Sequence, residues 1–279
     1  MCADRRFTAG TSAPARALSL VGQSACVRGA ALPRAERTAP DYVHLARCVL
    51  DHRAVGVVGP QTGVQLPNGR AFHENSIIPY LAQDVTFTLD RLAALNPVDA
   101  NGILAGKLDL RRVGVFAVSL GGIVASEACR LDARLRACLV MDAPMSTDVV
   151  KAGLHQPGMW IKRDATSMRL ERQRAGGWSE AEIEAHQTSM RTVYEGPSGT
   201  KYFVRVPGMF HSNFTDIPNW TPLAPQLGLA GPIDARRAHD IVNAYSLAFF
   251  NRHLLGRSAA LLDGAAKQYP DALFESRRP

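Results

Sequence analysis

The sequence predicts an α/β fold whose largely parallel central sheet is covered by helices on both faces. Short apolar runs typical of buried strands alternate with longer segments in which apolar residues recur at helical spacing. Parallel strands must be joined by a crossover of a dozen or more residues, so this alternation favours βαβ units. The chain has 279 residues, of which 46% are hydrophobic and 20% charged, as is usual for a globular protein.

The predicted elements succeed one another from residue 41 to near the C-terminus. We expect strands at 54–59, 112–118, 137–141, 158–163 and 200–206, the last being the final strand. We expect helices at 41–52, 80–95, 120–130, 179–195 and 236–255. Ser179 and Glu182 have the spacing of a capping box at the start of one helix. Since no repeat or low-complexity linker interrupts this part of the sequence, we expect one domain over 41–279.

Residues 1–40 form a basic, poorly defined segment with little periodicity. It carries six arginines against two acidic residues, so four of the seven surplus positive charges of the chain lie there. A basic tail can bind nucleic acid or anionic lipid. This one has no aromatic interleaving and no basic run longer than Arg5-Arg6. We therefore interpret it as a solvated leader and expect no nucleic-acid partner.

Targeting and redox signals leave the compartment and the oligomeric state open. No apolar stretch approaches the roughly 18 residues of a membrane span, and the run at 17–22 is too short for a clear signal peptide. Cytoplasmic and secreted or periplasmic locations are both compatible. The five cysteines show no CxxC spacing, so we expect no disulfide framework or zinc site. We expect Cys129 and Cys138 to be buried as small hydrophobic residues.

A serine stands between a predicted strand and a predicted helix in the stretch VFAVSLGGIVASEACR, residues 115–130. Ala117 and Gly121 flank Ser119 at the two-residue spacing of a G-x-S-x-G nucleophile elbow, with alanine replacing the first glycine. Such an elbow is a strained turn that exposes the serine hydroxyl. The helix that follows begins at Leu120, whose N–H is a candidate oxyanion donor. The alternative interpretation is that Ser119 only caps this helix.

A serine nucleophile needs a base, and His211 has the most suitable position in the chain. It lies in the loop after the last predicted strand, where the base of a set in the order Ser…Asp…His is found on such a sheet. An acid must orient the imidazole. Asp142 follows one strand and Asp164 follows the next. The residues alone leave both open, since aspartate at a strand end is also a common helix cap.

Three segments, RVGVFAVSLGG, ACLVMDAPM and GMFHSNFTDIP, carry a resemblance to a known family. They are similar to the corresponding parts of plasma-type platelet-activating-factor acetylhydrolases and their bacterial relatives. The H-x-x-F-x-D piece formed by His211, Phe214 and Asp216, together with the aspartate after a strand, is much more specific than the elbow. The likeness runs from about Tyr42 to the C-terminus.

This resemblance implies an α/β-hydrolase fold and a serine carboxylic ester hydrolase with the triad Ser119, Asp142 and His211. Lipid-like or short-acyl esters are the substrates it implies, with no metal or organic cofactor. Related enzymes place a second oxyanion donor in a Gly-rich loop that follows an N-terminal strand. Gly22 and Gln23 are the nearest candidates for that donor, although residues 18–42 are only faintly similar to this region. The segment 1–40 is then a degenerate form of the oxyanion loop.

Three apolar residues, Trp160, Met209 and Phe210, are candidates for the substrate pocket, although the same residue types are common in a core. Two other functions remain open at this point. One is a non-catalytic binding protein of the hydrolase fold. The other is a lipase- or polyester-type esterase that uses Asp164 as its acid. The expected partner of either enzyme is a small-molecule ester or lipid.

Overall fold

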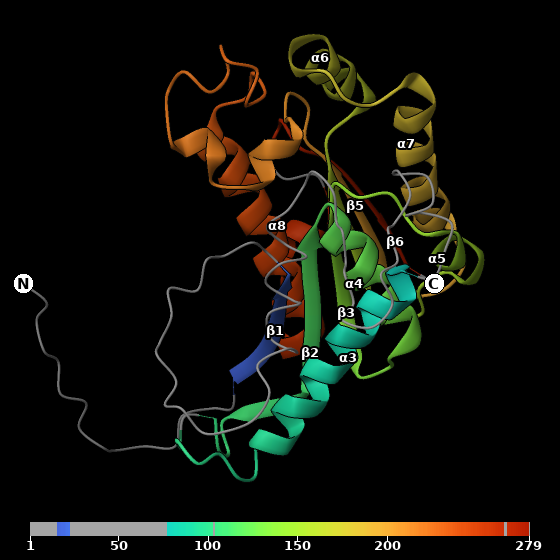
Figure 1. Ribbon diagram of the computed structural model, residues 1–279, viewed down its shortest axis with the longest axis vertical. Helices are drawn as coiled ribbons and strands as arrows, with labels where there is room; N and C mark the ends of the chain where they lie inside the picture. The colour runs from blue at the N-terminus through green and yellow to red at the C-terminus, as the bar shows by residue number, and fades with distance from the viewer. Residues whose placement is uncertain (1–15, 23–76, 103, 265–266, 279) are drawn as a thin grey trace, which may run out of the picture.

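A computed structural model of the protein describes residues 16–22, 77–102, 104–264 and 267–278 (Figure 1). The helix predicted at 41–52, the strand predicted at 54–59 and Gln23 lie outside these residues. Within these residues the fold is one central sheet with helices on both faces.

A sheet of six strands forms the centre of the fold, and its strands lie side by side in chain order. The strands are β1 (Arg16–Gly22), β2 (Leu108–Val118), β3 (Leu135–Met141), β4 (Gly158–Lys162), β5 (Lys201–Arg205) and β6 (Leu273–Arg277). Strands β1 to β5 are parallel, and β6 pairs antiparallel with β5. The largely parallel sheet predicted from the sequence is confirmed, and so are the four predicted strands that fall within the described residues.

Two strands correct the sequence-based prediction. Residues 16–22, which we assigned to a leader, form β1 and pair with β2, so the predicted boundary at residue 41 leaves out part of the sheet. The strand at 200–206 is the last parallel strand, but β6 follows it. Strand β6 has the sequence LFESR and is mostly exposed, because it pairs with a neighbour on one side. It was not predicted because it lacks the apolar run that marks a buried strand.

The connections between the strands are helical. The helices are α3 (Ile77–Leu95), α4 (Leu120–Leu131), α5 (Thr147–Ala152), α6 (Ala165–Ala175), α7 (Glu180–Glu195) and α8 (Ala235–Leu255), with short 3-10 helices η1 (His211–Phe214), η2 (Ile217–Asn219) and η3 (Ala260–Leu262). The helices predicted at 80–95, 120–130, 179–195 and 236–255 are confirmed. The capping box of Ser179 and Glu182 is formed. Helices α5 and α6 were not predicted.

Two apolar clusters fill the space between the sheet and the helices. Alternate residues of the strands point to opposite faces, so Val140 belongs to the cluster beneath α3, α4 and α7, whereas Leu139 belongs to the cluster beneath α8. Figure 1 shows α8 on one side of the sheet and α3 and α4 on the other. Cys129 and Cys138 are buried, as predicted. Because helices cover both faces of the sheet, polar groups gather at the edge formed by the carboxyl ends of the strands.

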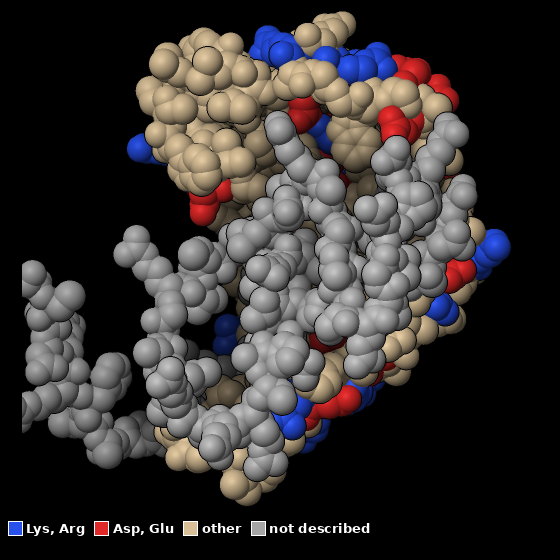
Figure 2. Space-filling model, in the orientation of Figure 1, with Lys and Arg blue, Asp and Glu red and all other residues tan. Residues whose placement is uncertain are grey.

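Arginines gather on α6, near the carboxyl ends of the strands. Arg169 and Arg172 both pair with Glu180, at 2.5 and 3.2 Å. Figure 2 accordingly shows basic and acidic side chains next to one another at the end of the molecule where α6 lies. Exposed pairs of this kind contribute about 0–1 kcal/mol each to stability. Glu180 therefore offsets part of the positive charge of α6.

His253 in α8 is not the surface residue that its place near a helix end suggests. Its Nε2 lies 3.1 Å from the Tyr202 hydroxyl, and its ring packs against the rings of Tyr202 and Phe249. Burial lowers the pKa of His253 to about 4, so the ring is neutral at pH 7. The side chain is half-buried and packs against the core on the α8 side of the sheet.

Candidate active site

Ser119 occupies a strained turn between β2 and α4. Its φ of 58° and ψ of −133° put it in a region that residues other than glycine rarely adopt. Its side chain makes no capping hydrogen bond to α4, so the simple helix-cap interpretation is not supported. The Ser119 N–H donates to the carbonyl oxygen of Met141 at 3.0 Å, which holds the turn against the end of β3. These features are those of a nucleophile elbow.

Small residues around Ser119 allow the turn to sit close to the sheet. A Cβ atom at Gly122 would lie 2.8 Å from the Cβ of Ala143 and 2.9 Å from Cγ1 of Val140, so the first turn of α4 needs glycine there. Ala117, which replaces the glycine of the usual pattern, is almost fully buried in the core. Leu120 is the first residue of α4, so its N–H has no acceptor within the helix.

Asp142 lies at the end of β3, next to the turn that carries Ser119. Its φ of 46° makes it, with Ser119, one of two described residues other than glycine that have a positive φ. Its backbone N–H donates to the Ile161 carbonyl at 2.9 Å, and its carboxylate is fully buried. Oδ2 lies 2.7 Å from Nδ1 of His211. Two strained residues at neighbouring strand ends indicate a functional edge, because strain of this kind concentrates at such sites.

Asp164, the other candidate acid, has a structural role. It is the N-cap of α6, and its Oδ1 accepts the N–H of Ser167 at 2.6 Å. The histidine is paired with Asp142 instead. The alternative in which Asp164 orients the base is therefore corrected by the structure, because the Asp164 carboxylate caps the helix that follows it.

His211 begins η1, six residues beyond the end of β5 in a tightly bonded loop. With Nδ1 directed to Asp142, its Nε2 is left for other partners, and 29% of the side chain is exposed. The fully buried side chain of Asn213 holds the loop: its Oδ1 accepts the N–H groups of Phe210 and Gly231, both at 2.8 Å. Nothing in the sequence pattern distinguished Asn213, because its partners are two backbone groups that only the folded loop brings together.

Replacing Asn213 with alanine should destabilise the protein and displace His211. The substitution leaves two buried N–H groups without an acceptor, at a cost of about 1–3 kcal/mol each. We expect the free energy of unfolding, measured with urea, to fall accordingly. Asn213→Asp, which keeps an acceptor oxygen, should recover part of the loss. An unchanged free energy of unfolding in Asn213→Ala would contradict this role.

Buried charged groups surround the Asp142–His211 pair. Burial opposes the charge on Asp142, but Arg163, His211 and His186 outweigh it and hold the pKa of this carboxyl well below its usual range. Burial lowers the pKa of His186 to about 4, and its Nε2 lies 3.9 Å from Asp142 Oδ1. Burial also lowers the pKa of Lys162 to about 8. Asp142 is thus an anion at neutral pH, and His186 beside it is uncharged.

The substrate contacts predicted from the sequence are not found on a surface. Met209 and Phe210 are fully buried, and Met209 belongs to the core cluster beneath α8. Trp160 is fully buried in the other cluster, where its Nε1 donates to Sδ of Met145 at 3.3 Å. Trp160 lies in the middle of β4, and Met209 and Phe210 lie in the loop after β5, so none of the three side chains is presented on a surface of the described residues.

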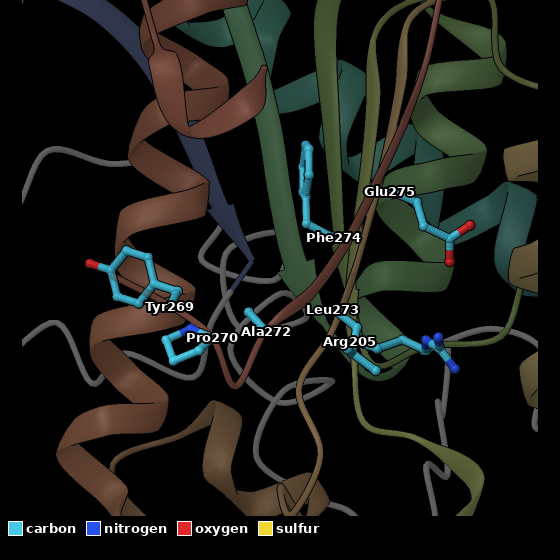
Figure 3. A pocket seen from close by; sticks show the side chains of 7 residues that line it. All are labelled: Arg205, Tyr269, Pro270, Ala272, Leu273, Phe274 and Glu275. Atoms are coloured by element: carbon cyan, nitrogen blue, oxygen red, sulfur yellow. The ribbon is translucent and has the colours of Figure 1, made fainter. Parts of the chain in front are cut away.

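A pocket lies elsewhere, at the edge of the sheet formed by β5 and β6 (Figure 3). Its lining residues are Arg205, Tyr269, Pro270, Ala272, Leu273, Phe274 and Glu275. None of them is a candidate catalytic residue. Within the part of the chain that the structure describes, no cluster of three or more His, Cys, Asp or Glu residues could hold a metal ion. No helix in the same part is long and apolar enough to cross a membrane.

Comparison with known proteins places this geometry in a family. The model of the family described as platelet-activating factor acetylhydrolase, isoform II, matches residues 98–267, which include the elbow, the strand-end aspartate and the histidine. The chain belongs to this acetylhydrolase family. Its α/β-hydrolase fold agrees with a solved relative, a ferulic acid esterase from Streptomyces cinnamoneus, at a TM-score of 0.55 and 28% identity over 71% of this chain and 54% of the esterase.

Other members of the acetylhydrolase family are similar over part of their length. A platelet-activating factor acetylhydrolase of Cavia porcellus is 28% identical over 54% of this chain and 32% of the relative. A probable 1-alkyl-2-acetylglycerophosphocholine esterase of Arthroderma benhamiae is 23% identical over 73% of this chain and 51% of the relative. The chain thus spans about a third to a half of the length of the curated relatives it matches.

Proposed function

We propose that this protein is a serine carboxylic ester hydrolase whose catalytic residues are Ser119, His211 and Asp142. The observation that carries the proposal is the 2.7 Å contact between Asp142 Oδ2 and His211 Nδ1, made beside a serine in a left-handed elbow. The carboxylate fixes the tautomer in which Nδ1 carries the proton and Nε2 is a base. The acetylhydrolase and esterase names of the relatives support the same chemistry.

The reaction proceeds through an acyl-enzyme. Nε2 of His211 takes the proton of the Ser119 hydroxyl as Oγ bonds to the acyl carbonyl carbon, and the carbonyl oxygen becomes an oxyanion. The N–H of Leu120 donates to this oxyanion. The imidazolium then gives its proton to the departing alkoxide, which leaves as the alcohol. Water repeats the sequence, so that the carboxylic acid is released and the serine hydroxyl is restored.

The substrates we propose are lipid-like or short-acyl esters. The support comes from the acetyl and phosphocholine esters in the names of the relatives, and from the requirement of this mechanism for an acyl carbon with an alcohol leaving group. A metal or organic cofactor has no step to perform in it. We propose a small-molecule ester or lipid as the partner and no nucleic acid.

Labelling combined with an ester assay tests the function directly. The purified protein should hydrolyse p-nitrophenyl acetate, with rates that fall as the acyl chain is lengthened. A fluorophosphonate probe should label it, and mass spectrometry of the labelled peptide should place the adduct on Ser119. A folded protein that neither turns over an ester of any acyl length nor takes the label would instead be a non-catalytic binding protein of this fold.

A further inference from the structure

A buried arginine joins the two groups that hold the proposed base. Arg163 follows β4, and its side chain is completely buried. Its Nε lies 2.8 Å from Oδ2 of Asp142, and Nη1 forms an ion pair with Oε2 of Glu171 on α6. The Nε–H does not point at the Asp142 oxygen closely enough for a hydrogen bond, so this contact acts through charge. One guanidinium thus bridges two carboxylates that come from different elements.

Both carboxylates also contact His211, at opposite ends of the residue. Asp142 Oδ2 meets Nδ1 of the ring at 2.7 Å. Glu171 accepts the backbone N–H of His211, with Oε2 at 3.2 Å and Oε1 at 3.4 Å. Arg163 contacts neither the ring nor the backbone of the histidine. Its two partners, however, fix the histidine's side chain and main chain together.

A buried charge of this kind is costly and needs a reason. Replacing buried ion pairs with apolar groups of similar size is often neutral or stabilising, so the pairs are weak evidence of a purely structural role. The ring of Trp178 lies 5.7 Å from the Arg163 guanidinium and excludes water from one side of it. A guanidinium keeps its proton even when buried. It therefore supplies a permanent positive charge beside Asp142 at any pH at which the protein is folded.

We infer that Arg163 is a positioning residue of the proposed hydrolase, which sets the orientation of His211 and the proton affinity of the Asp142–His211 pair through Asp142 and Glu171. This inference rests on the proposed function. Removing the positive charge leaves an isolated carboxylate in the interior, and the pair then binds its proton at higher pH, whichever atom holds it. A substitution that keeps the positive charge but loses the two separate contacts with Asp142 and Glu171 leaves the His211 ring less firmly oriented.

Charged and titratable groups of the described residues lie near the pair. Arg163 contacts it from the position after β4, Glu171 from α6 and His186 from α7. Lys162 of β4 acts on Asp142 through its charge. Of these, the neutral His186 would charge only near pH 4, and Lys162 would lose its charge near pH 8. Between about pH 4 and pH 8, neither His186 nor Lys162 changes its charge. A shift of the pair's titration in this range therefore reports the loss of the Arg163 charge.

Three substitutions separate charge from orientation. In Arg163→Gln, kcat for p-nitrophenyl acetate should fall on the order of 10²-fold with little change in KM, as expected for a misplaced base. The acid limb of the pH profile of kcat/KM should also move up by about one pH unit. Arg163→Lys should keep the acid limb in place but lose kcat, because a single ammonium cannot occupy both places at which Nε and Nη1 of Arg163 meet Asp142 and Glu171. Glu171→Gln should lower kcat and move the acid limb in the opposite direction, to lower pH, because it removes a negative charge from the neighbourhood of the imidazolium.

Arg169→Gln is the matched control, since Arg169 lies on α6 with an exposed side chain that pairs with Glu180. An Arg163→Gln variant that melts like Arg169→Gln, keeps its acid limb and loses no more activity than the control would overturn the inference. A titration of the His211 ring by NMR, with the resonance assigned through His211→Gln, gives the same answer without turnover. If the wild type is inactive, the proposed function fails, but the NMR titration still tests the inference. A His211 titration midpoint at higher pH in Arg163→Gln than in the wild type supports it, and an unchanged midpoint overturns it.

Discussion

Replacing Ser119 with alanine will lower kcat for p-nitrophenyl acetate on the order of 10⁶-fold, the scale of losing the nucleophile of a serine hydrolase. The physical reason is that no other hydroxyl replaces the one presented by the left-handed turn at the end of β2. Initial rates at saturating substrate and labelling by a fluorophosphonate measure the effect. Both should disappear together, because both require the same oxygen.

The control for Ser119→Ala is its stability. Alanine at this position removes a side chain that makes no capping hydrogen bond, so the melting temperature should change little. Turnover that survives in a pure, folded Ser119→Ala preparation would show that the nucleophile lies elsewhere. The mechanism proposed above would then be wrong even if the protein is an esterase.

Replacing Asp142 with asparagine should lower kcat on the order of 10⁴-fold while leaving the site largely in place. The amide can present its NH₂ group to Nδ1 of His211, which favours the tautomer that protonates Nε2 and removes the base. It also leaves Arg163 beside a neutral group in the interior. The pH profile of kcat and the folded fraction by circular dichroism together distinguish lost chemistry from lost structure.

Asp164→Asn is the matched comparison for Asp142→Asn. Asparagine caps helices about as well as aspartate, so α6 should keep its N-terminal hydrogen bond to Ser167. Turnover should stay within about twofold of the wild type, since a surface change away from reacting groups has little effect. Equal losses in the two variants would contradict the assignment of Asp142 as the acid.

The parts of the site that follow strands could be predicted from the sequence, because the carboxyl ends of parallel strands meet at one edge. Ser119 and His211 were found in this way, from the apolar runs that precede them and from their order in the chain. The same reasoning left Asp142 and Asp164 open, since both follow a strand. Only the fold shows that one carboxylate faces the histidine and the other faces its own helix.

The residues that support the histidine could not be predicted, because their partners come from distant segments. Arg163 is 21 positions beyond Asp142, and Glu171 is 40 positions before His211, with no spacing rule to link them. Asn213 binds two backbone groups that have no sequence signature. Strand β1 was not predicted because its short apolar run was assigned to the basic N-terminal segment, and β6 was not predicted because its sequence lacks the apolar run of a buried strand.

The strands of the described sheet lie side by side in the order in which they occur along the chain. Ser119, Asp142 and Arg163 follow β2, β3 and β4, whereas His211 comes only after β5. Since a chain is synthesised from its N-terminus, a nascent chain that has reached only β4 carries the proposed nucleophile without its proposed base. The proposed reaction therefore requires that β5 and the loop after it have been made.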